Sequence, residues 1–516
     1  MSEDVVIVGA GTAGLMLAHE LALAGVRPVV LDRAERTARE APALALNAGV
    51  VELLAQRGFM DVLRDRGNEF PAAQWAYLWL DPERLGDPHP FTFGIPQPML
   101  DAHIREVLGK LGVEVRTGHE VVGLSQDADG AVVEVRTPDG RESVRCRYVV
   151  GCDGARGTVR ELAGIEAPGE DHPFWGIYGE VEAELGGDLF EHLMPVLHPD
   201  GSSFVVSPSD PQALRVLMGE APPPADGKLL MRVITGEFGV APKDGDAPVT
   251  AEELRSRARV ITGADTDMGE TKWLARWGYS VRQAAEYRKG RVFLAGDAAH
   301  HHFPLGGVAL STGLDDAVNL GWKLAAELNG WAPDGLLDTY HEERHPVGER
   351  ACRSTEAQVF LMHRLREAEP LRDLLGELME LEDVNEYFVK LGGGLDARYA
   401  MLPGVSAEDS PHRLMGTRLP DFPLDTATGP TNVARLLYSG RGVLLDLSDG
   451  ALPAGAAAGW TDRVDVVTAR PAEGIDAGVV LLRPDGRVAW ADSRPSDVSG
   501  LRTALETWFG APRDVK

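Results

Sequence analysis

Three glycines and an aspartate near the start of the chain have the types and spacing of a dinucleotide-binding turn. The glycines are Gly9, Gly11 and Gly14, and the aspartate is Asp32. Gly9 permits a tight turn, Gly11 lets a pyrophosphate approach the backbone, and Gly14 lets a helix pack closely on the preceding strand. The Asp32 carboxylate can accept hydrogen bonds from ribose hydroxyls. Together these residues predict a site for an adenine dinucleotide, either NAD or FAD.

The elements that must position these residues form one βαβ unit. A β-branched run at 5–8 predicts a buried parallel strand, apolar residues at helical spacing predict a helix that ends at Gly25, and residues 28–32 predict a second strand. The N-terminus of this helix would face the phosphates, because its unpaired N–H groups and its dipole favour an anion.

A further acidic residue, Asp153, follows a predicted β-meander. Runs at 113–116, 131–136 and 144–150 alternate apolar and polar residues and are separated by Asp-Gly turns, which predicts antiparallel strands. The last strand ends at Gly151, so Asp153 lies just beyond a strand end. That placement favours a ligand contact, and an ordinary Asp-Gly turn explains the segment equally well.

A third strand end carries the strongest local pattern. Residues 290–295 predict a buried strand that leads into Asp297. A helix is then predicted to begin near Ser311, with Asp315 and Asp316 in its first turns. The positive end of its dipole would point back toward the strand end, where it would stabilise negative charge on a reduced ring.

These three segments resemble the GxGxxG, DG and GD motifs of the single-component flavoprotein monooxygenases, the para-hydroxybenzoate hydroxylase-like family. The resemblance extends over nearly the whole chain and implies FAD as cofactor and NADPH as co-substrate. It implies that Asp297 binds the flavin ribityl chain, that Asp153 lies near the pyrophosphate and influences NADPH use, and that Gln97 contacts the flavin. The full set of implied cofactor contacts is Gly9, Gly11, Thr12, Ala13, Gly14, Asp32, Arg33, Gln97, Arg105, Asp153, Gly296, Asp297, Pro304, Gly307, Leu310 and Ser311.

The last hundred residues are similar to the thioredoxin-like tail of the actinobacterial aromatic polyketide and phenol hydroxylases, on the segments 416–420 and 479–490. This tail has no cysteine, so CxxC redox chemistry is excluded there, and packing or dimerisation is the favoured role. The predicted fold class is α/β: a discontinuous Rossmann-like FAD-binding domain, an antiparallel β-sheet substrate domain and a C-terminal thioredoxin-like domain. The predicted boundaries are 1–172 and 275–395 for the FAD-binding domain, 173–274 for the substrate domain, and 412–516 for the tail.

The predicted substrate domain consists of alternating strands at 181–184, 192–198, 203–207 and 214–219. One face of such a sheet is free to cover a pocket. Five aromatic residues are candidates to line that pocket, with an ordinary buried core as the alternative: Trp175, Tyr178, Phe204, Trp277 and Tyr279.

The resemblance implies a monooxygenase that uses NAD(P)H and O2, through a flavin C4a-hydroperoxide, to hydroxylate an aromatic polyketide or a phenolic substrate. Baeyer–Villiger oxygen insertion into a polycyclic ketone is one alternative, and a flavin-binding structural partner without its own turnover is another. Because the cofactor performs the difficult step, no side chain is assigned as a catalytic acid or base.

Two places depart from the family pattern. Arginines of the family correspond here to Pro42 and Gly49, and its Gly-Gln-Gly-Met-Asn run reads Gly-Val-Ala-Leu-Ser at 307–311. Loss of the arginine removes a cation near the flavin, and Ala309 adds a methyl group where backbone closely approaches the ring. We expect altered flavin affinity or ring mobility.

The histidines at 300–302 invite a metal interpretation, which we reject. Adjacent histidines on an extended chain point to opposite sides, and no carboxylate or cysteine lies at ligand spacing. The predicted site therefore holds no metal.

The composition bounds the partners of the chain. A net charge of −28 over 516 residues disfavours nucleic acid and anionic lipid as partners. Three widely spaced cysteines fit a reducing compartment, and we find no run of about 20 apolar residues that would predict a membrane span. We expect a cytoplasmic enzyme with a small-molecule substrate, and a homodimer is left open.

Overall fold

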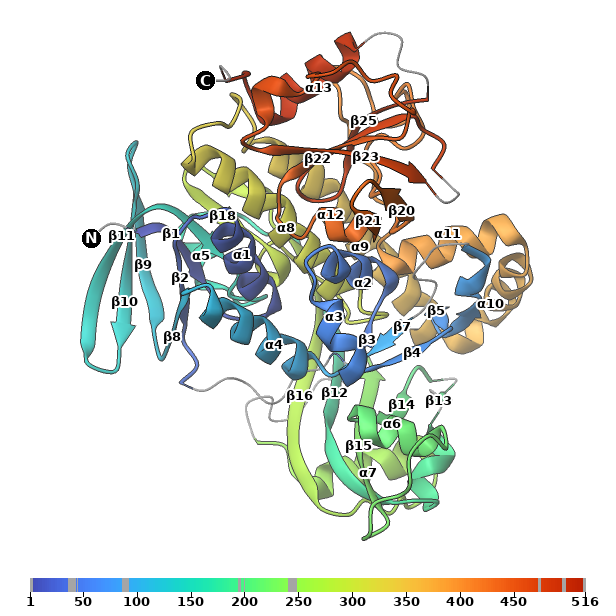
Figure 1. The fold of residues 1–516 in the computed structure, drawn as a ribbon. Coiled ribbons are helices and arrows are strands. Elements are labelled where there is room, and N and C mark those ends of the chain that lie inside the picture. The colour runs from blue at the N-terminus through green and yellow to red at the C-terminus, as the bar shows by residue number, and fades with distance from the viewer. Residues whose placement is uncertain are drawn as a thin grey trace.

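The computed structural model describes residues 3–35, 43, 45–85, 92–193, 196–198, 200–239, 248–471, 475–493 and 498–513. Three large sheets organise these residues. Figure 1 shows the first sheet at the left, the second sheet at the bottom in green and the third at the top in red. No helix in the described ranges is both long enough and apolar enough to span a bilayer.

The first sheet has the strand order β17–β18–β11–β1–β2–β8, and β10 and β9 continue antiparallel from β11. The pairs β1–β2, β1–β11, β11–β18 and β2–β8 are parallel, so the carboxyl ends of these strands meet at one edge. The strand bounds are β1 Glu3–Val8, β2 Pro28–Asp32, β8 Glu114–Thr117, β9 Glu120–Gln126, β10 Ala131–Thr137, β11 Gly140–Gly151, β17 Arg288–Lys289 and β18 Val292–Leu294.

Helices cover this sheet and bury its apolar strands. The helix α1 (Thr12–Leu23) packs against α4 (Gln97–Lys110) and α8 (Val308–Leu328), and α8 packs against α9 (Thr339–His363). Val5, Val6 and Ile7 of β1 are fully buried, as expected of a parallel strand covered on both faces. The predicted βαβ unit is therefore confirmed.

The predicted β-meander is partly wrong. The run at 113–116 corresponds to β8, which pairs in parallel with β2 rather than with the meander. Besides β11, the strand that pairs with β10 is β9, which was not predicted. A tight turn separates β8 from β9: the Gly118 and His119 N–H groups donate to the carbonyl oxygens of Ala34 and Asp32, which fixes β8 beside β2.

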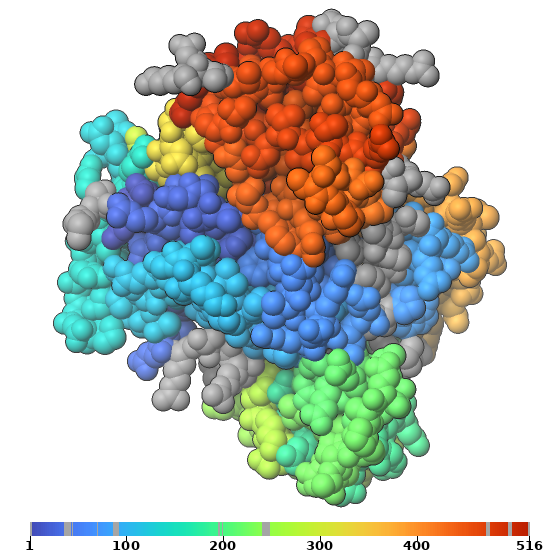
Figure 2. Space-filling model, in the orientation of Figure 1, coloured from blue at the N-terminus to red at the C-terminus, as the bar shows by residue number. Residues whose placement is uncertain are grey.

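The second sheet is antiparallel, with the strand order β13–β14–β15–β12–β16–β19. Figure 2 shows its residues, in green, as a separate lobe. The predicted strand at 214–219 is wrong, because α6 (Pro211–Leu217) lies there; Asp210 caps this helix by accepting from the Ala213 N–H, and Pro211 starts it. The other bounds are β12 Gly169–Glu184, β13 Val196–Leu197, β14 Ser203–Pro208, β15 Lys228–Phe238, α7 Ala251–Thr262, β16 Thr271–Gln283 and β19 His300–His301.

The third sheet, near the C-terminus, has the order β21–β20–β23–β22–β24–β25. Its core includes Trp322 and Ala326 of α8, so it packs directly on the first domain. The thioredoxin-like assignment and the domain boundaries stay predictions. The bounds are β20 Pro423–Thr426, β21 Gly429–Asn432, β22 Gly442–Asp446, β23 Val464–Pro471, β24 Val479–Leu482, β25 Val488–Asp492 and α13 Ser499–Phe509.

A group of smaller elements flanks α9 on the side away from the first sheet (Figure 1). The helix α11 contacts β5, and α10 contacts α9. The bounds are α2 Ala48–Ala55, β5 Ala73–Trp75, β6 Leu78–Leu80, α10 Leu365–Met379 and α11 Glu382–Gly393.

Candidate functional site

The first glycine turn connects β1 to α1. Gly9 adopts φ +103°, and a Cβ there would lie 2.3 Å from the Cys152 carbonyl oxygen, so only glycine fits. A Cβ on Gly14 would lie 2.1 Å from the Gly9 carbonyl oxygen, so Gly14 permits the helix to pack on the turn. By contrast, Gly11 is exposed and a Cβ there would meet no protein atom within 4 Å. The space beside Gly11 is open to a ligand.

The N-terminus of α1 faces this open space. Gly11 is its N-cap, no side chain caps it, and no acidic residue occupies its first turn. The first N–H groups of a helix have no acceptor within the helix, so those of Thr12 and Ala13 are available to a phosphate.

Asp32, at the end of β2, shapes the same turn. Its Oδ2 accepts from the Ala10 N–H at 2.7 Å, and its Oδ1 accepts from the Ala34 N–H at 2.8 Å. An ionised carboxylate has about four acceptor positions, so Asp32 can accept from a ribose hydroxyl as well.

A cavity of about 290 Å³ lies at this edge of the sheet and collects five of the predicted residues: Gly9, Gly11, Asp32, Arg33 and Asp153. The remaining lining residues were not predicted, and they are Val8, Leu31, His119, Glu120, Val121, Cys152, Gly154, Arg156 and Thr158. His119 and Glu120 follow β8, so only the recognition of β8 as a parallel strand could have found them.

Asp153 follows the end of β11 and is incompletely satisfied by the protein. Its Oδ2 accepts from the Val159 N–H at 3.0 Å. Its Oδ1 is buried and has no hydrogen-bond partner within the described chain. Burial raises the pKa of this carboxyl group. A buried acceptor without a partner is costly, and a bound hydroxyl or N–H group would remove that cost.

Asp297 follows the end of β18. Its side chain is 48% exposed, yet surrounding protein raises its pKa by burial. His301 Nδ1 lies 3.9 Å from Asp297 Oδ2, too far for a hydrogen bond. In the described chain no hydrogen bond to the Asp297 carboxylate is found, so it is available to a ligand.

The helix α8 begins at Val308, three residues earlier than predicted. Its N-cap is Gly307 at φ +73°, and no side chain caps it. The family's glycine-rich run is therefore the start of the helix, because the left-handed Gly307 turns the chain into it. Ser311 does not cap the helix; its hydroxyl instead accepts from Asn47 Nδ2 at 3.0 Å. The uncapped N-terminus of α8 supports the predicted role in stabilising an anion.

Asp316 was predicted in the first turns of α8. It lies further along the helix instead and is fully buried. It accepts from the Gly296 N–H at 2.9 Å, and it lies 2.7 Å from His300 Nε2 and 2.7 Å from Arg344 Nε. Burial alone would raise the pKa of Asp316, but Arg344 and His300 lower it overall. This network fixes the Gly296–Asp297 turn against α8 and α9.

Gln97 and Arg105, at two positions of α4, both contact the first turn. Gln97 Nε2 donates to Thr12 Oγ1 at 2.9 Å, and Arg105 Nη2 donates to the Ala10 carbonyl oxygen at 2.7 Å. Asp101, which was not predicted, accepts from Thr12 Oγ1 at 2.6 Å, and burial raises its pKa to about 6. Nothing in the sequence reveals this partner, because the contact joins two elements 89 residues apart.

The other predicted contacts lie around the start of α8. A Cβ on Gly296 would lie 3.2 Å from the Ala13 Cβ, so Ala13 joins the first and third strand ends. Pro304 is exposed and Leu310 is half-buried.

The two positions at which the family carries an arginine have different outcomes. Pro42 lies outside the described residues. At Gly49, a Cβ would lie 2.4 Å from the Gly393 carbonyl oxygen, so the local packing excludes any side chain, arginine included. Arg418 of the C-terminal region donates to the Gly49 carbonyl oxygen at 2.9 Å and pairs with Asp315. A guanidinium from another part of the chain therefore lies beside this backbone.

The aromatic candidates divide between the two faces of the second sheet. Trp277 and Tyr279 lie in one cluster with Phe174 and Phe303. The ring centroid of Phe303 lies 5.2 Å from that of Trp277 and 5.0 Å from that of Tyr279. Trp175 and Phe204 lie in the separate core under α6 and α7, so they do not line the same face. Tyr178 packs against Trp273. Alternation along β12 explains the division.

Two of the three histidines at 300–302 contact other groups of the protein. His300 pairs with Asp316, and His302 Nδ1 lies 3.1 Å from the Phe303 carbonyl oxygen. Across the described ranges, no group of three or more His, Cys, Asp or Glu side chains is placed to hold a metal ion.

Two family models match the chain. The model described as an FAD binding domain matches residues 2–355, and the model described as an aromatic-ring hydroxylase C-terminal region matches residues 412–512. The chain belongs to the FAD-dependent aromatic-ring hydroxylases. FAD is the cofactor of this family, and the chain is an enzyme.

Relatives in this family are similar along their whole length. The dialkyldecalin synthase of Streptomyces rugosporus is 46% identical over 510 residues, which are 99% of each chain. The rifampicin monooxygenase of Streptomyces venezuelae is 40% identical over 512 residues, covering 98% of this chain and 99% of the relative. The structure of the anhydrotetracycline hydroxylase OxyS from Streptomyces rimosus matches with a TM-score of 0.88 and 38% identity, covering 99% of this chain and 100% of OxyS.

Proposed function

We propose that this chain binds FAD along the carboxyl ends of β1, β2, β11 and β18 and uses NAD(P)H and O2 to hydroxylate an aromatic polyketide or phenol. One observation carries the proposal. The open turn at Gly11, the unpartnered Oδ1 of Asp153 and the exposed carboxylate of Asp297 lie at one edge of a single parallel sheet.

The residues at this edge of the sheet fit the successive parts of the FAD molecule. The N-terminus of α1 would bind the pyrophosphate, Asp32 a ribose and Asp297 the ribityl hydroxyls. The N-terminus of α8 would stabilise negative charge on the reduced ring. Bound FAD would supply the hydride acceptor and the site of oxygen activation.

The aromatic cluster around Phe303 would form the substrate wall of this site. Phe303 directly precedes Pro304, one of the proposed flavin contacts, and packs against Trp277 and Tyr279 of β16. Aromatic side chains hold a flat apolar ring and exclude water, which protects reactive intermediates from hydrolysis. The role of these residues is positioning and solvent exclusion rather than acid–base chemistry.

The replacement Gly11→Ala should weaken FAD binding by about tenfold or more without destabilising the chain, because the added Cβ meets no protein atom but occupies space proposed for the pyrophosphate. Fluorescence titration of the apoprotein with FAD measures the affinity, and thermal unfolding of the apoprotein measures the stability. Gly109→Ala is the matched control, since a Cβ on Gly109 of α4 also meets nothing within 4 Å. Equal FAD affinity in both variants would contradict the proposed position of the pyrophosphate.

The hydroxylation is tested by substrate-dependent NADPH oxidation under 18O2. With an anhydrotetracycline-type or rifampicin-type polyketide as substrate, we expect NADPH consumption and one labelled oxygen in the product. A labelled lactone would indicate Baeyer–Villiger insertion instead. No substrate-dependent NADPH oxidation with any polyketide offered would contradict the hydroxylase.

A second candidate function is carbon–carbon bond formation that closes the rings of a polyketide. The observation that favours it is the 46% identity to a dialkyldecalin synthase, against 40% to a rifampicin monooxygenase and 38% to an anhydrotetracycline hydroxylase. In that case FAD would have a structural role. Formation of a product isomeric with the substrate, under argon and without NADPH, would support this second function.

A further inference from the structure

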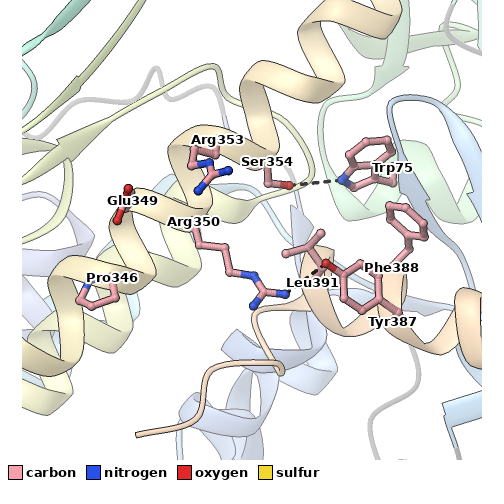
Figure 3. A pocket seen from close by; sticks show the side chains of 9 residues that line it. All are labelled: Trp75, Pro346, Glu349, Arg350, Arg353, Ser354, Tyr387, Phe388 and Leu391. Carbon is pink, nitrogen blue, oxygen red and sulfur yellow. Dashed lines mark hydrogen bonds between the residues drawn. The ribbon is translucent and has the colours of Figure 1, made fainter. Parts of the chain in front are cut away.

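A second cavity, of about 530 Å³, lies between α9, α11 and β5 (Figure 3). We propose that it binds a flat ring compound that carries a negative charge. This inference deepens the proposed function, since it concerns a second ligand site of the same enzyme. The lining residues are Trp75, Pro346, Glu349, Arg350, Arg353, Ser354, Tyr387, Phe388 and Leu391.

Aromatic rings form one wall of this cavity. The rings of Trp75 and Phe388 pack with centroids 4.8 Å apart, and Phe388 contacts Tyr387 at 5.3 Å. Trp75 Nε1 donates to Ser354 Oγ of α9 at 3.3 Å, which fixes the indole across the cavity (Figure 3). Tyr387 is 53% exposed, so a large part of its ring is available for stacking.

Arginines of α9 form the opposite wall. Arg350 points toward Tyr387, with its Nη2 3.5 Å from the Tyr387 hydroxyl, and its Nη2 lies 2.7 Å from Asp396 Oδ2. Arg353 is exposed and has no ion pair or hydrogen bond to any residue that the structure describes. Glu349 also lines the cavity, but it pairs with neither arginine in that part of the chain. In a protein of net charge −28, an unpaired guanidinium beside aromatic faces favours an anionic ring.

One side of the cavity lies close to the start of α8. Leu391 lines it, and the next residue, Gly392, accepts from Asn47 Nδ2 at 3.0 Å. The same amide donates to Ser311 Oγ in α8. A ligand that contacts Leu391 is therefore adjacent to Gly392, which Asn47 connects to Ser311 of α8. Such a ligand has two chemical sources: the acidic ring of the polyketide substrate, or the phosphate-bearing adenosine of NADPH.

The test is calorimetric titration of the FAD-loaded enzyme with 3-hydroxy-2-naphthoate, a flat aromatic acid. We expect measurable binding that weakens by about tenfold or more in Arg353→Gln and in Arg350→Gln, because each loses a charge-assisted hydrogen bond. The neutral methyl ester should bind about tenfold more weakly than the acid. Arg366→Gln is the matched control, since Arg366 is an exposed arginine outside the cavity, and it should bind the acid as the wild type does.

Competition with 2′,5′-ADP assigns the source. Displacement of the naphthoate indicates NADPH, and its absence indicates the polyketide; both outcomes support the site. No naphthoate binding, or equal binding in the wild type and both arginine variants, overturns it. An enzyme that binds the acid through Arg353 but consumes no NADPH contradicts the hydroxylase and keeps the site, whereas NADPH consumption with binding unchanged in Arg353→Gln contradicts only the site.

Discussion

The variant Asp297→Ala is expected to purify with little or no bound flavin. Its exposed carboxylate follows the end of β18 and accepts no hydrogen bond from the described chain, and a hydrogen bond to a charged group contributes about 1.5–3 kcal/mol. Loss of two ribityl contacts would therefore weaken FAD binding by about 100-fold or more. The visible flavin absorbance of the purified variant measures the retained cofactor.

Asp139→Ala provides the control for this variant. Asp139 is exposed in the turn between β10 and β11, far along the sheet from the strand ends, so its replacement should leave the flavin content unchanged. The Asp297→Ala chain should keep its fold, since the carboxylate makes no hydrogen bond to the described protein. Full flavin absorbance in Asp297→Ala would refute the ribityl assignment.

The variant Arg483→Ala is expected to lower the free energy of unfolding by about 3–5 kcal/mol, because it removes the ion-pair partner of buried Asp485 and leaves buried Glu343 with Lys323 as its one remaining ion-pair partner in the described chain. Arg483 is fully buried between the C-terminal region and α9. Its Nη1 and Nη2 donate to the two oxygens of Glu343 at 2.7 and 2.8 Å. Burial alone would raise the pKa of Glu343, but Arg483 and Lys323 hold it at about 2.

Urea unfolding followed by circular dichroism measures this loss, with Arg502→Ala as the control. Arg502 pairs with Glu506 on the exposed face of α13, and a surface pair of this kind contributes at most about 1 kcal/mol. Equal stability of the two variants would show that the C-terminal region does not depend on the buried pair. Flavin content should fall in Arg483→Ala only as far as the folded fraction falls.

Local sequence patterns predicted the parts of the site that depend on local geometry. Gly9 and Gly14 could be predicted because their spacing is typical of a strand-to-helix turn in which these two positions admit only glycine. Asp297 could be assigned because it ends a buried strand. Each of these features is specified within about a dozen residues.

Long-range contacts account for what the sequence did not reveal. The partners of Asp316 come from three elements, and Asp101 meets Thr12 only because α4 packs on α1. The strand β9 was missed because Gly123 and Ser125 interrupt its apolar alternation. At 214–219, the Asp-Pro helix start at 210–211 was a usable signal that the apparent alternation obscured.

The loss of the family arginine at Gly49 is also a question of long-range packing. The Gly393 carbonyl oxygen occupies the position that a side chain would need, and Arg418 comes to the same backbone from the C-terminal region. Since Arg418 donates to the peptide and pairs with Asp315, its positive charge is not available to replace that of the missing arginine. The altered flavin affinity or ring mobility expected from the sequence remains a prediction.

The most direct test of the central claim is the flavin stoichiometry of the purified wild-type chain. Heat release of the cofactor, followed by chromatographic identification, gives the nucleotide and its amount for each chain. The arrangement of strand ends predicts FAD at about one molecule per chain. A colourless protein that takes up no FAD from an excess in solution would contradict it.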